Sequence, residues 1–381
     1  PHETIGLPYV DFVFINEGVY GLLDLLQTNY VDELDKVRGL VYKKHGFAAI
    51  GAPGEIVQTK DMDRVMPGYA WDLVELNKYR AHYWHNYFKD DGRTPFAAIS
   101  TSLGCSFGCN FCMINIVNRT SYEQGVVSSD SRGMRFWSPE LMLKEFEYLY
   151  ENGVRTVRLT DEMFFLNRKY YIPILEGIKQ RGMDFNFWAY ARVDSVRKDQ
   201  LELFKDAGVN WLCLGIEAAN QNVRLEIEKG KFEDVDIRRV VADVKAADIN
   251  ILGNYMFGFP EDTMETMQET LDLSLELNTE HANFYAAMAL PGSPLYMYAK
   301  NSGWDLPERF EEFAFLSYDC KPLRTKTLTG AEVLKFRDEA WHKYFSHEPF
   351  LKLVETKFGA DSRQNLEEMS KIKLKRKILG D

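Results

Sequence analysis

Two kinds of hydrophobic pattern alternate between residues 96 and 294. Short runs rich in β-branched and aromatic residues are each followed by a turn and then by an amphipathic stretch with helical spacing. The predicted strands are Phe96–Leu103, Thr156–Glu162, Phe185–Arg192, Trp211–Ala218, Ile249–Phe257 and His281–Leu290. Repeated strand–helix alternation favours parallel strands covered by helices. The predicted fold class is α/β, a (β/α)6-type partial TIM barrel, with a doubly wound open sheet as the alternative.

The segments that flank this block predict a chain of three parts. Before it, a helical run near Tyr20–Val37 and a hairpin-like Gly39–Ile50 indicate a linker or domain remnant. After it, Thr329–Phe345 and Pro349–Phe358 have the spacing of amphipathic helices, and the basic run Lys371–Lys377 is interpreted as a solvated helix face. The predicted parts are residues 1–90 (linker or remnant), 91–305 (barrel) and 306–381 (mostly helical).

Composition narrows the class of protein. The 381 residues are 45% hydrophobic and 27% charged, and no apolar run approaches the roughly 20 residues needed to span a bilayer. The net charge of -11 argues against binding to nucleic acid. The chain opens on Pro1 with neither a basic leader nor an apolar signal core, so nothing suggests export, and the expected location is the cytoplasm.

Five cysteines are too few and too unevenly spaced for a disulfide framework. Three of them form C-x3-C-x2-C at Cys105, Cys109 and Cys112, directly after the first predicted barrel strand. Thiolates are the ligands of iron–sulfur clusters, and three on one loop would hold three corners of a cubane while leaving the fourth iron open. A zinc site completed by His82 or His85 is the alternative. Cys213 is predicted to be a buried core residue, and Cys320 a loop residue near the barrel mouth.

At these residues the sequence resembles the radical SAM (S-adenosylmethionine) superfamily, whose loop also has an aromatic residue before the last cysteine, here Phe111. The resemblance implies a [4Fe-4S] cluster on the three cysteines, with SAM chelating the open iron. One electron transferred into the sulfonium would then release methionine and a 5'-deoxyadenosyl radical. The alternative without catalysis is an iron–sulfur electron-transfer or scaffold protein.

Later strand ends are similar to the positions at which this superfamily contacts SAM. They imply SAM-binding roles for Phe111, Glu162, Arg192, Glu217 and Gly258. Arg192 could pair with the methionine carboxylate, although a rim ion pair would also explain it. Of Asp161 and Glu162, one side chain is expected to point inward and the other into a helix cap. Gly258 is equally explained by a turn. No catalytic acid or base is assigned.

The flanking segments are similar to the cobalamin-dependent branch of the superfamily. The likeness runs through Val10–Val13, Gly39–Tyr42 and Ala70–Leu73, which resemble the linker that follows a cobalamin-binding domain. The branch's D-x-H-x-x-G loop is missing and would lie upstream of Pro1. We therefore expect either that a cobalamin domain has been removed, lost or left out of the numbering, or that this protein never had one, and cobalamin itself stays in doubt.

This resemblance implies methyl transfer to an unactivated carbon or phosphorus. A radical SAM epimerase, dehydrogenase or cyclase shares every motif and stays open. The expected cofactors are a [4Fe-4S] cluster, SAM and possibly cobalamin. The expected partners are a small-molecule, sugar-nucleotide, lipid or peptide substrate and a flavodoxin- or ferredoxin-type electron donor.

Overall fold

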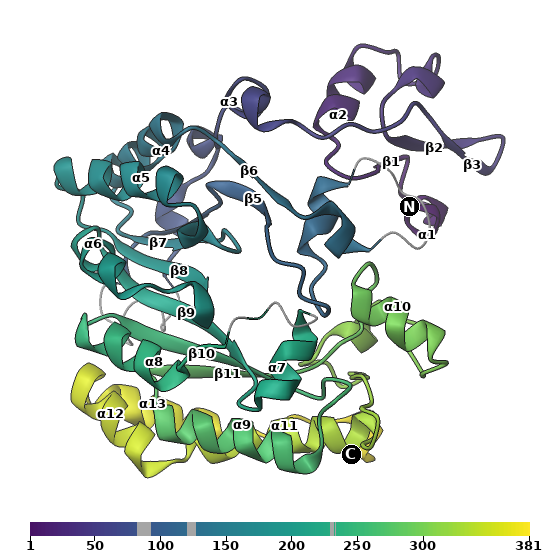
Figure 1. Ribbon diagram of the computed structural model, residues 1–381. Helices are drawn as coiled ribbons and strands as arrows, with labels where there is room; N and C mark the ends of the chain where they lie inside the picture. Colours follow the sequence, from purple (N-terminus) through teal and green to yellow (C-terminus); the bar gives the residue numbers. More distant parts are fainter. Residues whose placement is uncertain (82–92, 120–126, 229–231, 233) are drawn as a thin grey trace.

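A six-stranded parallel sheet forms the centre of the computed structural model, which describes residues 1–81, 93–119, 127–228, 232 and 234–381. The sheet has the strand order β11-β10-β9-β8-β7-β4 and curls into a half barrel (Figure 1). Its strands are β4 (Phe96–Ile99), β7 (Thr156–Leu159), β8 (Asn186–Arg192), β9 (Val209–Glu217), β10 (Asn250–Phe257) and β11 (His281–Ala286). The predicted partial barrel is confirmed, and all five neighbouring pairs are parallel.

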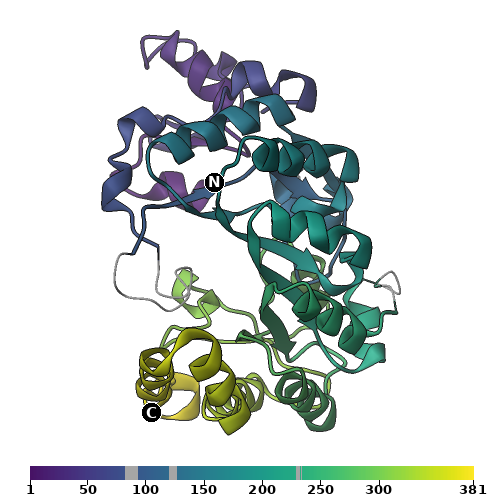
Figure 2. The ribbon, with the colours of Figure 1, turned by 90° about the vertical axis from the view of Figure 1, so that its left-hand side faces the viewer.

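Helices connect the strands and cover the convex face of the sheet (Figure 2). The helices between consecutive strands are α4 (Pro139–Glu151), α5 (Arg168–Gln180), α6 (Leu201–Asp206), α7 (Gln221–Ile227), α8 (Ile237–Ala246) and α9 (Met264–Leu277). Helix α10 (Pro294–Asn301) follows the last strand, β11. The start of α4 shows why the sequence folds this way. The Leu141 N–H donates to the Ser138 hydroxyl, and Pro139 occupies the first turn, where its missing N–H costs nothing.

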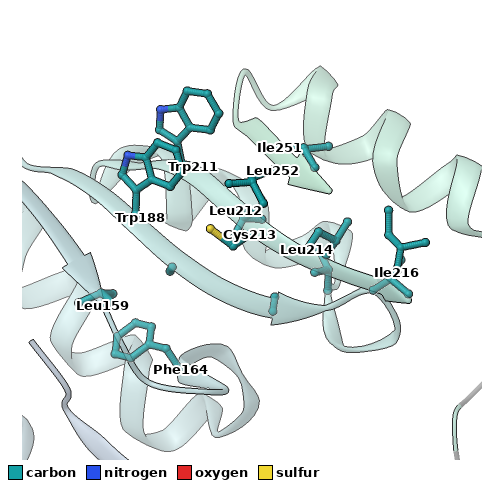
Figure 3. Packing of buried hydrophobic residues seen from close by; sticks show 14 of the residues in the cluster. Leu159, Phe164, Trp188, Trp211, Leu212, Cys213, Leu214, Ile216, Ile251 and Leu252 are labelled. Atoms are coloured by element: carbon teal, nitrogen blue, oxygen red, sulfur yellow. The ribbon is translucent and has the colours of Figure 1, made fainter. Parts of the chain in front are cut away.

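Stacked aromatic rings close the amino-terminal end of the half barrel. The Trp188 and Trp211 rings stack with centroids 4.3 Å apart, and Figure 3 shows them side by side on β8 and β9. Phe358, at the end of helix α12 (Glu348–Phe358), continues the stack at 5.9 Å from Trp211. Because these rings fill one end of the lumen, open space is left toward the carboxyl ends of the strands.

The predicted strand Phe96–Leu103 is wrong in its second half. The chain leaves the main sheet after Ile99, and β5 (Ser102–Cys105) pairs antiparallel with β6 (Gly133–Phe136) in a sheet of its own. The buried carboxylate of Asp161 causes the break, because it accepts hydrogen bonds from the Thr101 N–H at 3.0 Å and the Ser102 hydroxyl at 2.5 Å. After this corner, β5 ends at Cys105, the first residue of the cysteine motif.

The amino-terminal part forms a small separate sheet with its own core. This part contains α1 (His2–Gly6), β1 (Phe12–Phe14), α2 (Val19–Leu26), β2 (Leu40–Lys44) and β3 (Phe47–Ile50). The later short helix α3 (Met62–Val65) packs Met62 into the main core. The hairpin-like segment is the β2–β3 hairpin. Arg38 and Asp24 pair through two hydrogen bonds of 2.7 and 2.8 Å. An ion pair between Glu17 and the buried Arg135, at 2.8 Å, joins this part to β6.

The carboxyl-terminal part packs helix α11 (Gly330–Phe345), α12 and α13 (Ala360–Ser370) beside the barrel. The helix expected over Lys371–Lys377 is wrong, since α13 ends at Ser370 and only a short 3-10 turn, beginning at Lys377, follows. Arg376 is fully buried and pairs with Asp338 at 2.8 Å, while the other residues of the run are exposed. No helix of the described residues is long and apolar enough to cross a bilayer. The division at residues 90 and 305 stays a prediction.

Candidate active site

The cysteine loop is anchored to three different parts of the fold. Cys105 ends β5, and its N–H donates to the buried Asn115 side chain at 2.8 Å. The Asn115 amide in turn donates to the Phe107 carbonyl at 3.0 Å. Asn110 bonds through its backbone to Ile227 at the end of α7 and to Leu295 at the start of α10. The loop therefore has a fixed position over the carboxyl ends of the strands.

Gly104 has a left-handed backbone, with φ of +84°. A Cβ there would lie 2.4 Å from the Gly133 carbonyl oxygen and equally close to the Asn118 amide nitrogen. Only glycine fits this conformation at so close an approach. The residue thus lets β5 turn into the cysteine loop.

A largely apolar cavity of about 450 Å³ collects the predicted site residues at this end of the barrel. Cys105, Cys109 and Cys112 line it together with Phe111, Glu162, Arg192 and Glu217. Gly258 does not line it. Gly258 takes φ of +88° in a turn, donates its N–H to Asp262 at 2.9 Å and lies against Val333. The turn interpretation of Gly258 thus accounts for its contacts.

Each of the three sulfurs accepts one N–H hydrogen bond. The donors are the Phe107 backbone to Cys105 at 3.4 Å, the Ile114 backbone to Cys112 at 3.5 Å, and the Arg192 guanidinium to Cys109 at 3.5 Å. Burial raises the pKa of the Cys105 thiol to about 11, so the metal-free loop carries thiols. N–H bonds to sulfur favour the thiolate form, which is the form that ligates iron.

The chemistry of the donor set, three cysteine sulfurs that line one cavity, fits an iron–sulfur cluster. Among the described residues, no group of three or more Cys, His, Asp or Glu side chains surrounds a point where a single ion would be held. A cubane separates its ligands because each sulfur binds a different iron. His82 and His85, the residues of the zinc alternative, lie outside the described residues.

Arg192 is held by protein carboxylates and does not present an open guanidinium. It donates to both Asp194 oxygens at 2.7 and 2.6 Å and to Glu228 at 2.6 Å, and all three residues are buried. Glu228 also accepts the Gly108 N–H of the cysteine loop at 2.8 Å. The predicted pairing with a methionine carboxylate would have to compete with these bonds, so the rim ion pair describes Arg192 better.

The two acidic neighbours that follow β7, Asp161 and Glu162, have different surroundings. Glu162 lines the cavity, while Asp161 holds the β4–β5 corner. The expectation that one of the pair caps a helix is therefore wrong. Glu217 also faces the cavity and has a left-handed backbone with φ of +65°. Burial raises the pKa of Glu217 to about 7, and its carboxylate folds back over Gly215, where a Cβ would lie 2.7 Å from an Oε atom.

The sequence of the chain matches a known protein family over the segment that forms most of the barrel. Residues 99–274 match the family described as the Radical SAM superfamily. The chain contains a radical SAM domain. An uncharacterized methyltransferase of Pyrococcus horikoshii is 27% identical over 89% of this chain and 68% of its own length. An anaerobic magnesium-protoporphyrin IX monomethyl ester cyclase of Cereibacter sphaeroides is 25% identical over 86% of this chain and 50% of its own length.

Solved radical SAM enzymes share the fold at low sequence identity. The cobalamin-dependent SAM radical enzyme OxsB superposes with a TM-score of 0.62 and 16% identity, over 94% of this chain and 55% of its own. The radical SAM methyltransferase TsrM of Kitasatospora setae gives 0.57 and 17%, over 77% and 54%. The chain thus spans about half the length of these enzymes. The predicted superfamily and its enzymatic class are confirmed.

Sequence reasoning missed several residues that shape the site of this radical SAM domain. Glu228 and Asn115 position the cysteine loop, and Phe313 and Phe315, far along the chain, form part of the cavity wall. Cys320 is buried and does not line the cavity. The glycines beside the cysteines made the loop recognisable in the sequence. No neighbouring residue indicated a role for Glu228, because its partner Gly108 lies 120 residues away.

Proposed function

We propose that this protein cleaves SAM reductively at a [4Fe-4S] cluster held by Cys105, Cys109 and Cys112, and that it transfers a methyl group to an unactivated carbon or phosphorus. The observation that carries the proposal is the gathering of three hydrogen-bonded sulfurs in one apolar cavity at the carboxyl edge of a parallel sheet. When bound, the cluster supplies the electron that breaks the sulfonium bond of SAM.

The chain's own residues bind, orient and shield. Phe111 lies 5.6 Å from the Phe259 ring and closes one side of the cavity with apolar surface. Glu162 and Glu217 offer carboxylate oxygens to an amine or to ribose hydroxyls. The remaining wall is rich in methionine and aromatic side chains, including Met256, Met288 and Phe315. An apolar wall excludes water from a reactive radical.

The methyl-transfer part of the proposal is supported by named relatives. Besides the Pyrococcus horikoshii protein, bacteriochlorophyllide d methyltransferases of Chlorobaculum tepidum are 25% identical over 62% and 63% of this chain. Both solved neighbours are described with cobalamin bound. We therefore include cobalamin as a cofactor of the complete reaction, in addition to the cluster and SAM. A flavodoxin- or ferredoxin-type donor would supply the electron.

A radical reaction without methyl transfer is the second candidate. It is favoured by the relatives named as cyclases, which match 86% and 94% of this chain at 25% and 23% identity. Both candidates require the same three cysteines. They differ in products, because methyl transfer consumes a second SAM and yields S-adenosylhomocysteine.

The test compares the wild type with Cys112→Ala and with a matched cysteine variant. Each protein is reconstituted with iron and sulfide without oxygen, then given SAM and dithionite, with and without methylcobalamin. Products are quantified by mass spectrometry. Cys320→Ala is the control, because Cys320 is buried and does not line the cavity.

We expect 5'-deoxyadenosine from the wild type and from Cys320→Ala but not from Cys112→Ala. S-adenosylhomocysteine that accumulates with methylcobalamin would support methyl transfer, and its absence beside 5'-deoxyadenosine would favour the cyclase-like candidate. Intact SAM recovered with a verified, reducible four-iron cluster would refute both and point to electron transfer or a scaffold role.

A further inference from the structure

A second cavity of about 260 Å³ lies deeper in the half barrel, toward the amino ends of the strands. Tyr190, Cys213, Asn254 and Tyr285 line both this cavity and the cysteine-lined one. The two cavities are therefore neighbouring parts of one lumen. Figure 3 shows Trp188, Cys213 and Leu252, three of the deeper cavity's lining residues, on adjacent strands.

Arg158 on β7 is the one permanently charged side chain among the described residues that line this deeper cavity. Its guanidinium carbon lies 5.2 Å from the centroid of the Tyr190 ring. Within the described parts of the chain, Arg158 forms no ion pair and donates no hydrogen bond to a carboxylate. Burial raises the pKa of Glu162, which lines the first cavity, and the charge of Arg158 partly opposes that rise.

The polar neighbours of Arg158 add a further hydrogen-bond donor. The Asn283 amide donates to the Asn254 carbonyl oxygen at 3.1 Å, and the Tyr285 hydroxyl points at the same oxygen from 3.5 Å. The acceptor of Asn254 is thus occupied, while its amide nitrogen donates to no acceptor among the described residues. A guanidinium and an amide N–H facing one cavity form an anion-binding set.

We propose that the deeper cavity binds a carboxylate of the substrate, whose apolar part then extends into the cysteine-lined cavity. This inference rests on the proposed function, since it assigns a substrate class to the same lumen. One guanidinium balances one negative charge, and the nearby Glu162 and Glu217 disfavour a phosphate dianion. Anchored at Arg158, the substrate would present a carbon at a set depth below the cluster loop.

The test measures binding without turnover. The wild type, with its cluster reconstituted and SAM present but no reductant, is titrated with 4-phenylbutanoate, its neutral amide and 3-phenylpropyl phosphate by ligand-observed NMR. Arg158→Gln and Asn254→Ala are the test variants. Arg168→Gln, a surface arginine of α5 with 55% of its side chain exposed, is the matched control. Melting temperatures verify that each variant is folded.

We expect the carboxylate to bind at least tenfold more tightly than the amide in the wild type and in Arg168→Gln. Arg158→Gln should lose that tenfold preference while the affinity for the amide stays the same, and Asn254→Ala should lose part of it. Equal binding of acid and amide, absent binding of the acid, or an unchanged preference in Arg158→Gln would overturn the proposal. If 3-phenylpropyl phosphate bound more tightly than 4-phenylbutanoate, the carboxylate proposal would be overturned in favour of a phosphate ligand.

A separate readout keeps the two proposals apart. Formation of 5'-deoxyadenosine by the wild type after reductant is added, with no probe present, reports on the proposed function alone. The carboxylate preference is measured before any reduction, so a failure to cleave SAM leaves the binding comparison intact.

Discussion

Glu228 joins the cysteine loop to the buried arginine that contacts Cys109. Its two oxygens accept from the Arg192 guanidinium at 2.6 Å and from the Gly108 N–H at 2.8 Å, and the residue is 5% exposed. Glu228→Gln keeps the shape but removes the charge, and its amide group then faces one of these donors. A hydrogen bond to a charged group contributes roughly 1.5–3 kcal/mol. Because Asp194 still neutralises Arg192, we expect a loss of about 2–3 kcal/mol in unfolding free energy.

The loss should appear in the cluster as well as in stability. Urea denaturation of the metal-free protein measures the free energy, and iron and sulfide per chain after reconstitution measure the cluster. We expect Glu228→Gln to lower the free energy of unfolding and the iron and sulfide content, since a carboxylate no longer accepts the Gly108 N–H. Glu226→Gln, an exposed carboxylate two residues earlier, is the control and should change neither. An unchanged denaturation midpoint together with full iron content in Glu228→Gln would refute the reasoning.

Three further predictions concern the loop and the two ends of the chain. Gly104→Ala should lose most of its iron after reconstitution. Gly153→Ala is the control and should keep its iron, because Gly153 also has a positive φ, +81°, but has open space around an added Cβ. Equal iron content in the two variants would contradict the steric argument. Asp24→Asn should cost about 0.5–1 kcal/mol at neutral pH. The arginine partner lowers the pKa of Asp24, so this stabilisation is present above the usual carboxyl pKa and vanishes as pH falls through the lowered value, which denaturation from pH 7 to pH 2 would show. Arg376→Met should lower the unfolding free energy by about 3–5 kcal/mol, and the exposed Lys375→Met should leave it unchanged in the same assay.

The sequence predicted what depends on local patterns. The largely hydrophobic run Ile249–Phe257 between turn residues contains β10, and the close spacing of Cys105, Cys109 and Cys112 placed all three on one loop. These features need only a few neighbouring residues to be recognised.

Features that depend on distant partners could not be predicted. Thr101 leaves the barrel strand because Asp161, 60 residues later, accepts its N–H. Arg192 could be placed at a strand end, but its carboxylate partner Glu228 follows a helix with no motif around it. Arg376 lies in a run of basic residues that favours solvent, and only the folded chain brings Asp338 to it.

The buried arginine near the end of the described chain has a consequence for the order of folding. Arg376 donates to the Phe315 and Ser317 carbonyls, 61 and 59 residues before it, and Phe315 belongs to the cavity wall. During synthesis these two hydrogen bonds cannot form until Arg376 has left the ribosome, long after the barrel strands have emerged. We therefore expect the nascent protein to expose its cysteine loop through a wider opening, which would give cluster-delivery proteins access before the last residues fix the wall in place.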